Sequence, residues 1–272
     1  RTSSFKLISQ TFKVSIVICT YGRPESLNET ITSLSHQTFK DFEIIFIMEK
    51  GDLSALRDKG LKASIGSITI FLDDDVYCPP TWLQGIVNTF EKEGVVGVTG
   101  PTTIPREFEK NRDSIRYKRL RRIQEWLFAV PTQPGKLSVC GTPSMGSNFE
   151  GCSYEGEVDY LECCNMAVRT KEAIDEGGFD YSFKKTSEWC EVDLAMRLAK
   201  RGRLFFTPLA SINHKPSKHG VYKCRLQTKH RWDNFIYFQR KWEGHCIKRG
   251  LRTYAYRAFV WTYLKMKDLR MI

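Results

Sequence analysis

The sequence lacks any run of about eighteen uncharged apolar residues, so we expect no segment that crosses a membrane. Its first residues also lack the apolar stretch of a secretory signal peptide. No two of the nine cysteines have the Cys-x-x-Cys spacing. This pattern indicates reduced thiols in a cytoplasmic protein, with a bridge involving Cys140, Cys152, Cys163 or Cys164 as the alternative.

Positive charge is concentrated near the C-terminus. The formal net charge is +11, and residues 222–272 hold thirteen Lys and Arg against three acids, interleaved with aromatic residues. A second basic cluster, residues 106–122, has eight Lys and Arg against three acids. Cations among aromatics suit a helix that lies on an anionic membrane. Aromatics in a core or a homodimer contact, beside a solvated basic face, fit the composition equally well.

Short apolar runs alternate with segments of helical period over the first hundred residues. This alternation predicts an α/β fold, with a doubly wound, mostly parallel sheet and helices on both faces. Loops that bind ligands would then lie together at the carboxyl edge of the sheet. The expected strands are residues 14–19, 42–48, 67–72 and 95–100, and the expected helices are residues 24–34, 55–64 and 82–93.

Three consecutive carboxylates, Asp73, Asp74 and Asp75, follow the third expected strand. Alternate residues of an extended chain point the same way, so Asp73 and Asp75 can converge on one cation while Asp74 points elsewhere. Carboxylate oxygens suit Mg²⁺ or Mn²⁺, which complete their coordination with substrate phosphates. Taken alone, such a triplet is more often a solvated acidic turn.

Several motifs occur in a fixed order along the chain. They are Thr-Tyr-Gly-Arg-Pro at 20–24, Phe-Glu-Ile-Ile-Phe-Ile-Met at 42–48, Leu-Arg-Asp-Lys-Gly at 56–60, Phe-Leu-Asp-Asp-Asp at 71–75 with Pro-Pro at 79–80, Cys-Asn-Met-Ala-Val-Arg at 164–169, Gly-Gly-Phe-Asp at 177–180 and Glu-Val-Asp-Leu at 191–194. Together they resemble the motifs of glycosyltransferase family 2 enzymes, which have the GT-A fold. The resemblance covers roughly residues 13–215, with a nucleotide-sugar-binding half at 13–100 and an acceptor or catalytic half at 101–215. A basic, aromatic-rich helical tail, residues 216–272, lies outside it.

The resemblance implies a donor site at the carboxyl edge. Asp73 and Asp75 match the family's DXD pair, with Asp75 as the direct metal ligand and Asp73 nearer the ribose. Met48 and Glu49 stand where the family usually has two aspartates, so UDP is the default nucleotide and GDP a competitor. His214 returns to this edge as a further metal ligand, although a lone histidine is more often structural. The residues implied in nucleotide-sugar binding are Thr20, Tyr21, Arg23, Glu49, Arg57, Asp73, Asp74 and Asp75.

A predicted helix near residue 191 resembles the segment that carries the family's catalytic base. Glu191 takes the place of the family's aspartate, and the first turn of a helix favours the ionised carboxylate that a base requires. Capping of the helix is the plain alternative. Asp193 faces another side of the helix, where it can pair with Arg197. The acceptor or supporting residues implied are Glu188, which is also the reserve base, Trp189, Asp193 and Asn165.

Together these features predict an inverting transferase that moves a sugar from a UDP- or GDP-sugar to an acceptor hydroxyl, with Mn²⁺ or Mg²⁺ as cofactor. A polyprenyl-linked or surface glycan is the expected acceptor, at the cytoplasmic face of the membrane. Residues 131–157, rich in Gly, Ser and Pro, are expected to form a lid. The alternative is a nucleic-acid- or membrane-binding protein without transferase activity. Nucleic acid is not favoured, because it leaves the carboxylates without a role.

Overall fold

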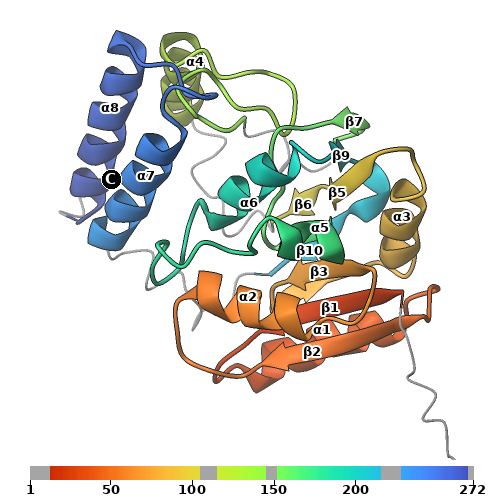
Figure 1. Ribbon diagram of the computed structural model, residues 1–272. Coiled ribbons are helices and arrows are strands. Elements are labelled where there is room, and N and C mark those ends of the chain that lie inside the picture. The colour runs from red at the N-terminus through yellow and green to blue at the C-terminus, as the bar shows by residue number, and fades with distance from the viewer. Residues whose placement is uncertain (1–12, 105–114, 145–151, 216–227, 269–272) are drawn as a thin grey trace, which may run out of the picture.

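A seven-stranded mixed sheet lies at the centre of the computed structural model of the chain (Figure 1). The structure describes residues 13–104, 115–144, 152–215 and 228–268. The strand order is β2-β1-β3-β8-β5-β9-β7. The strands are β1 (Val14–Cys19), β2 (Phe42–Ile47), β3 (Ile68–Leu72), β5 (Val95–Thr99), β7 (Gly156–Glu157), β8 (Asn165–Arg169) and β9 (Arg203–Phe206).

The first three strands pair as their apolar pattern predicts. β1 runs parallel to β2 and to β3, and all residues of β3 are buried. On its other side β3 pairs with antiparallel β8, which separates it from β5. Three of the six strand pairings are parallel and three are antiparallel. The antiparallel β8, from the second half of the chain, enters the middle of the sheet. Because β8 runs the opposite way, its first residue lies at the edge where β3 ends.

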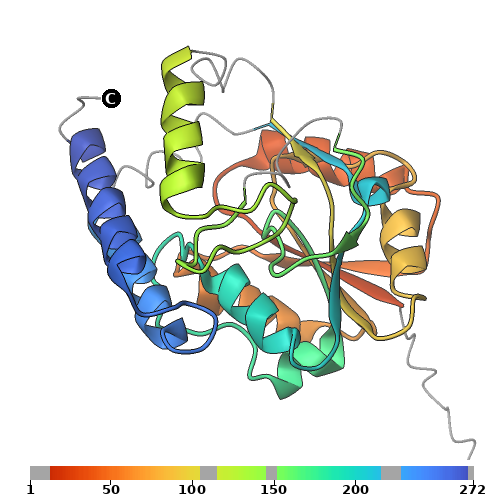
Figure 2. The ribbon, with the colours of Figure 1, turned by 90° about the horizontal axis from the view of Figure 1, so that it is seen from above.

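Helices cover both faces of the sheet and make three layers (Figure 2). On one face, Leu34 of α1 and Trp82 of α3 belong to an apolar cluster with Ile16 of β1. On the other face, Leu61 of α2 and Leu194 of α6 belong to the second large cluster. The helices are α1 (Pro24–Ser35), α2 (Leu53–Ala63), α3 (Trp82–Thr89), α4 (Ile115–Leu127), α5 (Thr170–Asp175), α6 (Cys190–Leu198), α7 (Thr228–Trp242) and α8 (Leu251–Asp268), with a short 3-10 helix, η3 (Pro208–Ala210).

A small second sheet, of order β4-β10-β6, lies beside the carboxyl edge of the large one. β10 (Ile212–His214) is antiparallel to β4 (Val76–Tyr77), so that His214 pairs with Val76. On its other side β10 runs parallel to β6 (Thr102–Thr103). This pairing brings a segment 140 residues downstream next to the carboxylate triplet.

The C-terminal segment is helical, as expected, but much of its aromatic surface is core. In α7, Phe235, Phe238 and Trp242 are buried, and the ring of Phe238 stacks on Trp189 at 4.7 Å between centroids. In α8, Tyr256 packs against Phe128, at the end of α4, at 5.0 Å. For α7, the burial of these aromatics agrees with the core alternative and leaves them unable to contact a membrane. Within the described residues, none of the helices combines the length and apolar character needed to cross a bilayer.

Two further expectations concern the loops and the thiols. Residues 131–144 form a loop in which Leu137 and Pro143 make an isolated antiparallel bridge. Residues 145–151 lie outside the described residues, so a lid over 131–157 stays a prediction. All eight cysteines within the described ranges are free thiols, in agreement with the reduced interpretation, and Cys224 lies outside those ranges.

Candidate functional site

The carboxylate triplet leaves the sheet beside two other polar segments. In the β3–β8 ladder Leu72 pairs with Asn165, so the next residues outward, Asp73 and Cys164, emerge side by side. The antiparallel β4–β10 pair places His214 against the same triplet from the other direction. Side chains from three distant parts of the sequence therefore meet at one point of the carboxyl edge.

His214 is the centre of this group. Its Nε2 lies 2.9 Å from Oδ1 of Asp75 and 3.9 Å from Oδ2 of Asp73, so both carboxylates approach the same imidazole. Ligand atoms of Asp73, Cys164 and His214 all lie within 4.8 Å of one another, which is the spacing of a potential cation site. The group brings in Asp73 rather than Asp75, although the family resemblance ranks Asp75 first as a ligand.

Asp74, in the turn that follows β3, is fully buried. Its Oδ1 lies 2.7 Å from Nη2 of Arg23, whose Nη1 is also 3.5 Å from Oδ2 of Asp75. Burial raises the pKa of Asp74 to about 6, although the Thr20 hydroxyl and Arg23 act in the opposite direction. Arg23 thus holds the turn after β1 against the turn after β3, and Asp74 anchors the triplet.

Arg57, on α2, lies between the donor carboxylates and the candidate base. Its Nη2 is 3.6 Å from Oδ1 of Asp73, and its Nη1 is 3.8 Å from Sγ of Cys190. Burial acts to lower the pKa of Arg57, but the charges of Cys163, Cys190, Asp73 and Glu191 outweigh it and keep the pKa well above its usual value. The guanidinium is therefore a permanent positive charge.

Glu191 lies in the first turn of α6, where the sequence predicts it. Burial raises the pKa of Glu191 to about 7, while Arg57 opposes the shift and the neighbouring Glu162 and Glu188 add to it. Desolvation of the carboxylate thus acts against the ionised form that the helix N-terminus favours. A carboxylate that titrates near neutrality is well matched to a general base.

A strained loop connects the base to the helix that carries Arg57. Lys185, Ser187 and Trp189 have φ values of 58°, 51° and 78°, which non-glycine residues rarely adopt. The loop caps the N-terminus of α2, because the carbonyl of Lys185 accepts the Leu53 N–H at 2.8 Å and the Ser187 hydroxyl accepts the Ser54 N–H at 3.1 Å. The same segment therefore fixes the start of α2 and the start of α6.

The residues expected on the acceptor side have structural contacts. Asp193 is buried among Arg197, Lys241 and Trp242, so its carboxylate cannot face a substrate. Asn165, also buried, accepts a hydrogen bond from the Trp82 indole. Glu188 pairs with Arg231 at 3.3 Å, and Trp189 packs on α7.

The residues expected near the nucleotide base follow the ends of β1 and β2. Cys19 pairs with Ile47 across those strands, so Tyr21 and Glu49 emerge from neighbouring positions. Tyr21 is exposed, with the ammonium of Lys50 4.8 Å from its ring centroid, and Glu49 is paired with Lys59. Thr20, the first residue after β1, is buried.

Sequence reasoning placed Cys164 in a family motif, 164–169, and considered it for a disulfide bridge, but gave it no role in the site. The signal that could have found it is its position directly before a buried apolar run, 165–169. That position joins the carboxyl edge only if the run is antiparallel to β3, and the run's direction is not readable from the sequence.

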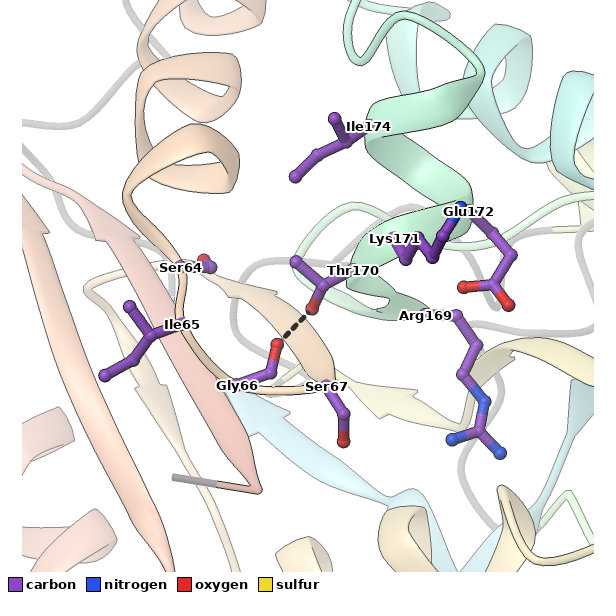
Figure 3. A pocket seen from close by; sticks show the side chains of 9 residues that line it. All are labelled: Ser64, Ile65, Gly66, Ser67, Arg169, Thr170, Lys171, Glu172 and Ile174. Atoms are coloured by element: carbon purple, nitrogen blue, oxygen red, sulfur yellow. Dashed lines mark hydrogen bonds between the residues drawn. The ribbon is translucent and has the colours of Figure 1, made fainter. Parts of the chain in front are cut away.

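A cavity of about 500 Å³ lies at the opposite edge of the sheet (Figure 3). It is lined by the turn before β3 and by the start of α5, where the Thr170 hydroxyl donates to the carbonyl of Gly66 at 2.6 Å. Its position at the amino end of β3 separates it from the carboxylates at the other end of the same strand. The cavity therefore does not belong to the candidate site.

Comparison with known proteins agrees with this geometry. Two solved structures resemble the chain over almost its whole length, and both are GT-A glycosyltransferases. The chain therefore has the GT-A fold. The family model for Glycosyl transferase family 2 matches residues 15–49 and 47–176, more than half of the sequence. The chain belongs to glycosyl transferase family 2.

Individual relatives are distant. The glucosyl-dolichyl phosphate glucuronosyltransferase of Haloferax volcanii is 22% identical over 267 residues, covering 86% of this chain and 75% of the relative. A mannosyltransferase from Pyrobaculum calidifontis, solved with GDP-Man and Mn²⁺, has a TM-score of 0.53 at 12% identity, covering 95% of this chain and 71% of that one. GalNAc-T7 with UDP, GalNAc and Mn²⁺ gives the same TM-score and identity, covering 97% and 57%. These two structures show the fold alone.

Proposed function

We propose that the chain transfers a sugar from a UDP- or GDP-sugar to an acceptor hydroxyl by one displacement that inverts the anomeric carbon. The observation that carries this proposal is the position of Arg57, 3.6 Å from Asp73 and close enough to Glu191 to lower its pKa. A single permanent cation thus joins the proposed donor carboxylates to the proposed base. That arrangement suits a reaction in which a diphosphate leaves beside the point where a hydroxyl is deprotonated.

The donor set at the carboxyl edge fits a divalent cation. Asp73, Cys164 and His214 offer an oxygen, a sulfur and a nitrogen within 4.8 Å, and Asp75 is hydrogen-bonded to His214. When bound there, Mn²⁺ or Mg²⁺ would neutralise the charge of the diphosphate. The presence of Mn²⁺ in both structurally similar glycosyltransferases supports this part of the proposal.

In the proposed reaction, the carboxylate of Glu191 takes the proton of the acceptor hydroxyl. The acceptor oxygen then attacks the anomeric carbon from the face opposite the nucleotide, and the bond from that carbon to the diphosphate oxygen breaks. The electron pair leaves with the nucleoside diphosphate, whose charge Arg57 stabilises. In this proposal Tyr21 and Glu49 contact the nucleotide base. Arg23 holds the carboxylate turn through Asp74.

We propose a sugar on a polyprenyl phosphate as the acceptor. The support is the relative named for its action on glucosyl-dolichyl phosphate, which aligns with 86% of this chain. The two structurally similar glycosyltransferases bind GDP-Man and UDP, respectively, so both nucleotides are candidates for the donor.

A lipid-linked acceptor requires access to a membrane surface, which we assign to the outer face of α8. Leu251, Tyr254 and Trp261 share this face and are 86%, 50% and 49% exposed. Lys248 and Lys265, both exposed, lie at its two ends. Exposed aromatic and aliphatic side chains flanked by cations match the interface of an anionic bilayer. The proposed membrane contact is therefore limited to α8, because the aromatic side chains of α7 are buried.

Calorimetric titration with UDP and GDP, each with and without Mn²⁺, tests the donor site. We expect Mn²⁺-dependent binding of one nucleotide, lost in Asp73→Ala and retained in Glu191→Gln. Incubation with the matching nucleotide sugars and a polyprenyl-phosphate glycan should then give a product of inverted anomeric configuration by NMR. Retained configuration would contradict the single displacement, and absence of nucleotide binding under all four conditions would contradict the donor site.

Co-sedimentation with vesicles tests the outer face of α8. We expect binding to vesicles that contain phosphatidylglycerol, weak binding to phosphatidylcholine alone, and loss of binding in Leu251→Ala/Trp261→Ala. Ile65→Ala, a change at an exposed apolar residue far from α8 in the sequence, is the matched control. Equal binding by the double variant and the parent chain would exclude this surface.

A further inference from the structure

We propose that Cys164 supplies a sulfur ligand to the cation at the carboxyl edge, so that this site prefers a thiophilic transition ion such as Zn²⁺ or Co²⁺ to Mg²⁺. The inference rests on the proposed function, because the cation is the one that donor binding would use. It gives a metal-binding role to Cys164, to which the sequence motifs assign none. It also changes which ion the site selects.

The sheet itself brings Cys164 to the carboxylates. β8 is antiparallel to β3, and the pairing of Leu72 with Asn165 makes Asp73 and Cys164 the first residues beyond the ladder at one edge. Asn165 is buried and is held by the Trp82 indole at 3.0 Å and by the Ala210 carbonyl at 2.6 Å. The backbone of Cys164 is therefore fixed by the core rather than by a loose loop.

The other two ligands come from segments that are equally fixed. His214 pairs with Val76 in the small sheet, and Asp73 follows a fully buried strand and faces Arg57 at 3.6 Å. One ligand atom from each of Asp73, Cys164 and His214 lies within 4.8 Å of the others. Bonds of about 2.0 to 2.3 Å to such an ion would space the ligand atoms about 3.5 Å apart. Side-chain rotations that move these atoms by about 1 Å would therefore bring them to bonding distance of the ion.

Ligand chemistry then decides the ion. Mg²⁺ takes oxygen ligands in a near-ideal octahedron, whereas sulfur and imidazole ligands select zinc and other transition ions. One carboxylate, one imidazole and one thiolate make three protein ligands and leave a fourth position for a substrate oxygen, as in catalytic zinc sites. Binding of the ion displaces the thiol proton of Cys164 to solvent. The weak contact of Cys164 with the Thr102 hydroxyl, at 3.6 Å, does not compete with a metal bond.

Titration of the full chain with Co²⁺, without any nucleotide, tests the sulfur ligand directly. A thiolate bound to Co²⁺ gives a near-ultraviolet sulfur-to-cobalt charge-transfer band, which oxygen and nitrogen ligands do not give. We expect this band in the parent chain, its loss in Cys164→Ser and its retention in Cys163→Ser, the adjacent cysteine. Asp73→Asn and His214→Ala should weaken Co²⁺ binding, which ties the band to this site and not to another thiol.

Competition calorimetry gives the selectivity. Loss of a group that only hydrogen-bonds to a metal ligand costs about 10- to 100-fold in metal affinity. Loss of a ligand itself, in Cys164→Ser, should therefore weaken Zn²⁺ binding by at least about tenfold. The same variant should leave Mg²⁺ affinity nearly unchanged, since Mg²⁺ gains little from sulfur.

The outcomes separate this inference from the proposed function. Co²⁺ binding that depends on Asp73 but shows no sulfur band overturns the role of Cys164 and leaves the metal-assisted donor site intact. A sulfur band that persists in Cys164→Ser also overturns it. Absence of any Co²⁺ binding overturns both the inference and the metal part of the proposed function, while nucleotide titration without metal still reports on the rest of the donor site.

Discussion

The guanidinium of Arg23 lies 2.7 Å from the carboxylate of Asp74, and the Asp74 side chain is completely buried. This pair joins the turn after β1 to the turn after β3. A buried ion pair therefore holds together the two segments proposed to bind the nucleotide. Burial nevertheless raises the pKa of Asp74 to about 6, against an ordinary value of 3.8. The anchor of the carboxylate triplet is therefore sensitive to pH.

Asp74 should make the free energy of unfolding fall as the pH rises. Between about pH 4 and pH 6 the folded chain holds a proton on Asp74 that the unfolded chain has lost, and this difference is worth on the order of 3 kcal/mol. Stability from this group is complete below pH 4 and lost above pH 6. In Asp74→Asn the decline should disappear, as measured by urea denaturation across this range.

The matched control for Asp74 is Asp73→Asn, which changes the adjacent, partly exposed carboxylate. This variant should keep the decline between about pH 4 and pH 6. If Asp74→Asn also keeps it, another group titrates in that window and the buried pair is not its source.

Glu191 should set the acidic limb of the pH–rate profile. A base must be ionised, so kcat/KM should rise with pH and level off above an apparent pKa of about 7. Glu191→Gln should lower kcat by about 10²- to 10⁴-fold and leave nucleotide binding intact. Because Glu162 raises the pKa of Glu191, Glu162→Gln should move the limb to lower pH. An unchanged profile in Glu191→Gln would transfer the role of base to Glu188.

Much of this arrangement could be predicted from local patterns. The apolar runs of β1, β2 and β3 and the triplet at the end of β3 are continuous features of the sequence. Asp74 and Asp75 lie in a turn, so the burial of Asp74 does not follow from alternation along an extended chain. Glu191 falls at the start of a helix whose period is visible in Leu194 and Leu198. Local propensity and family motifs therefore suffice for these residues.

The remaining features depend on contacts between distant segments. The direction of β8 places Cys164 at the carboxyl edge, and nothing within residues 165–169 specifies that direction. The pKa of Glu191 depends on how much protein surrounds it, which outweighs the helix-terminus effect that the sequence suggests. Asp193 was expected near the acceptor because of its neighbours in sequence, yet its partners Lys241 and Trp242 come from α7.

Ser187 should couple stability to catalysis. Its hydroxyl accepts the Ser54 N–H and donates to the Phe183 carbonyl, both at 3.1 Å. Ser187→Ala leaves the buried Ser54 N–H without its partner, whereas the Phe183 carbonyl still accepts from the Ser54 hydroxyl at 2.7 Å. This loss should lower the free energy of unfolding by about 1 to 3 kcal/mol. Because the loop fixes both Arg57 and Glu191, kcat should fall with little change in KM.

Ser187→Gly separates the two properties of Ser187. Glycine lacks the hydroxyl but adopts a φ of 51° without strain. It should therefore be more stable than Ser187→Ala while its kcat stays reduced. If kcat in both variants equals that of the parent chain, the loop does not position the base.

Asp193 should be essential for stability and dispensable for donor binding. Its carboxylate is fully buried and lies 2.9 Å from Arg197 and 2.8 Å from Lys241, with the Trp242 indole as a further donor at 2.9 Å. Asp193→Ala removes the buried carboxylate that Arg197 and Lys241 share, although Lys241 keeps Asp180 at 2.7 Å. The free energy of unfolding should therefore fall by about 3 kcal/mol. Chemical denaturation measures this loss, and nucleotide titration should remain normal wherever the variant is folded.

A second change distinguishes this structural role from a catalytic one. Lys241→Met removes one of the two cations that Asp193 pairs with. Asp193→Ala/Lys241→Met should therefore recover part of the stability lost in Asp193→Ala. The recovered fraction of folded protein should then transfer sugar at nearly the parental rate, because Glu191 and Arg57 are untouched. A double variant that is stable but inactive would show that Asp193 acts in the reaction, and the buried network joining α6 to α7 would then have a role beyond packing.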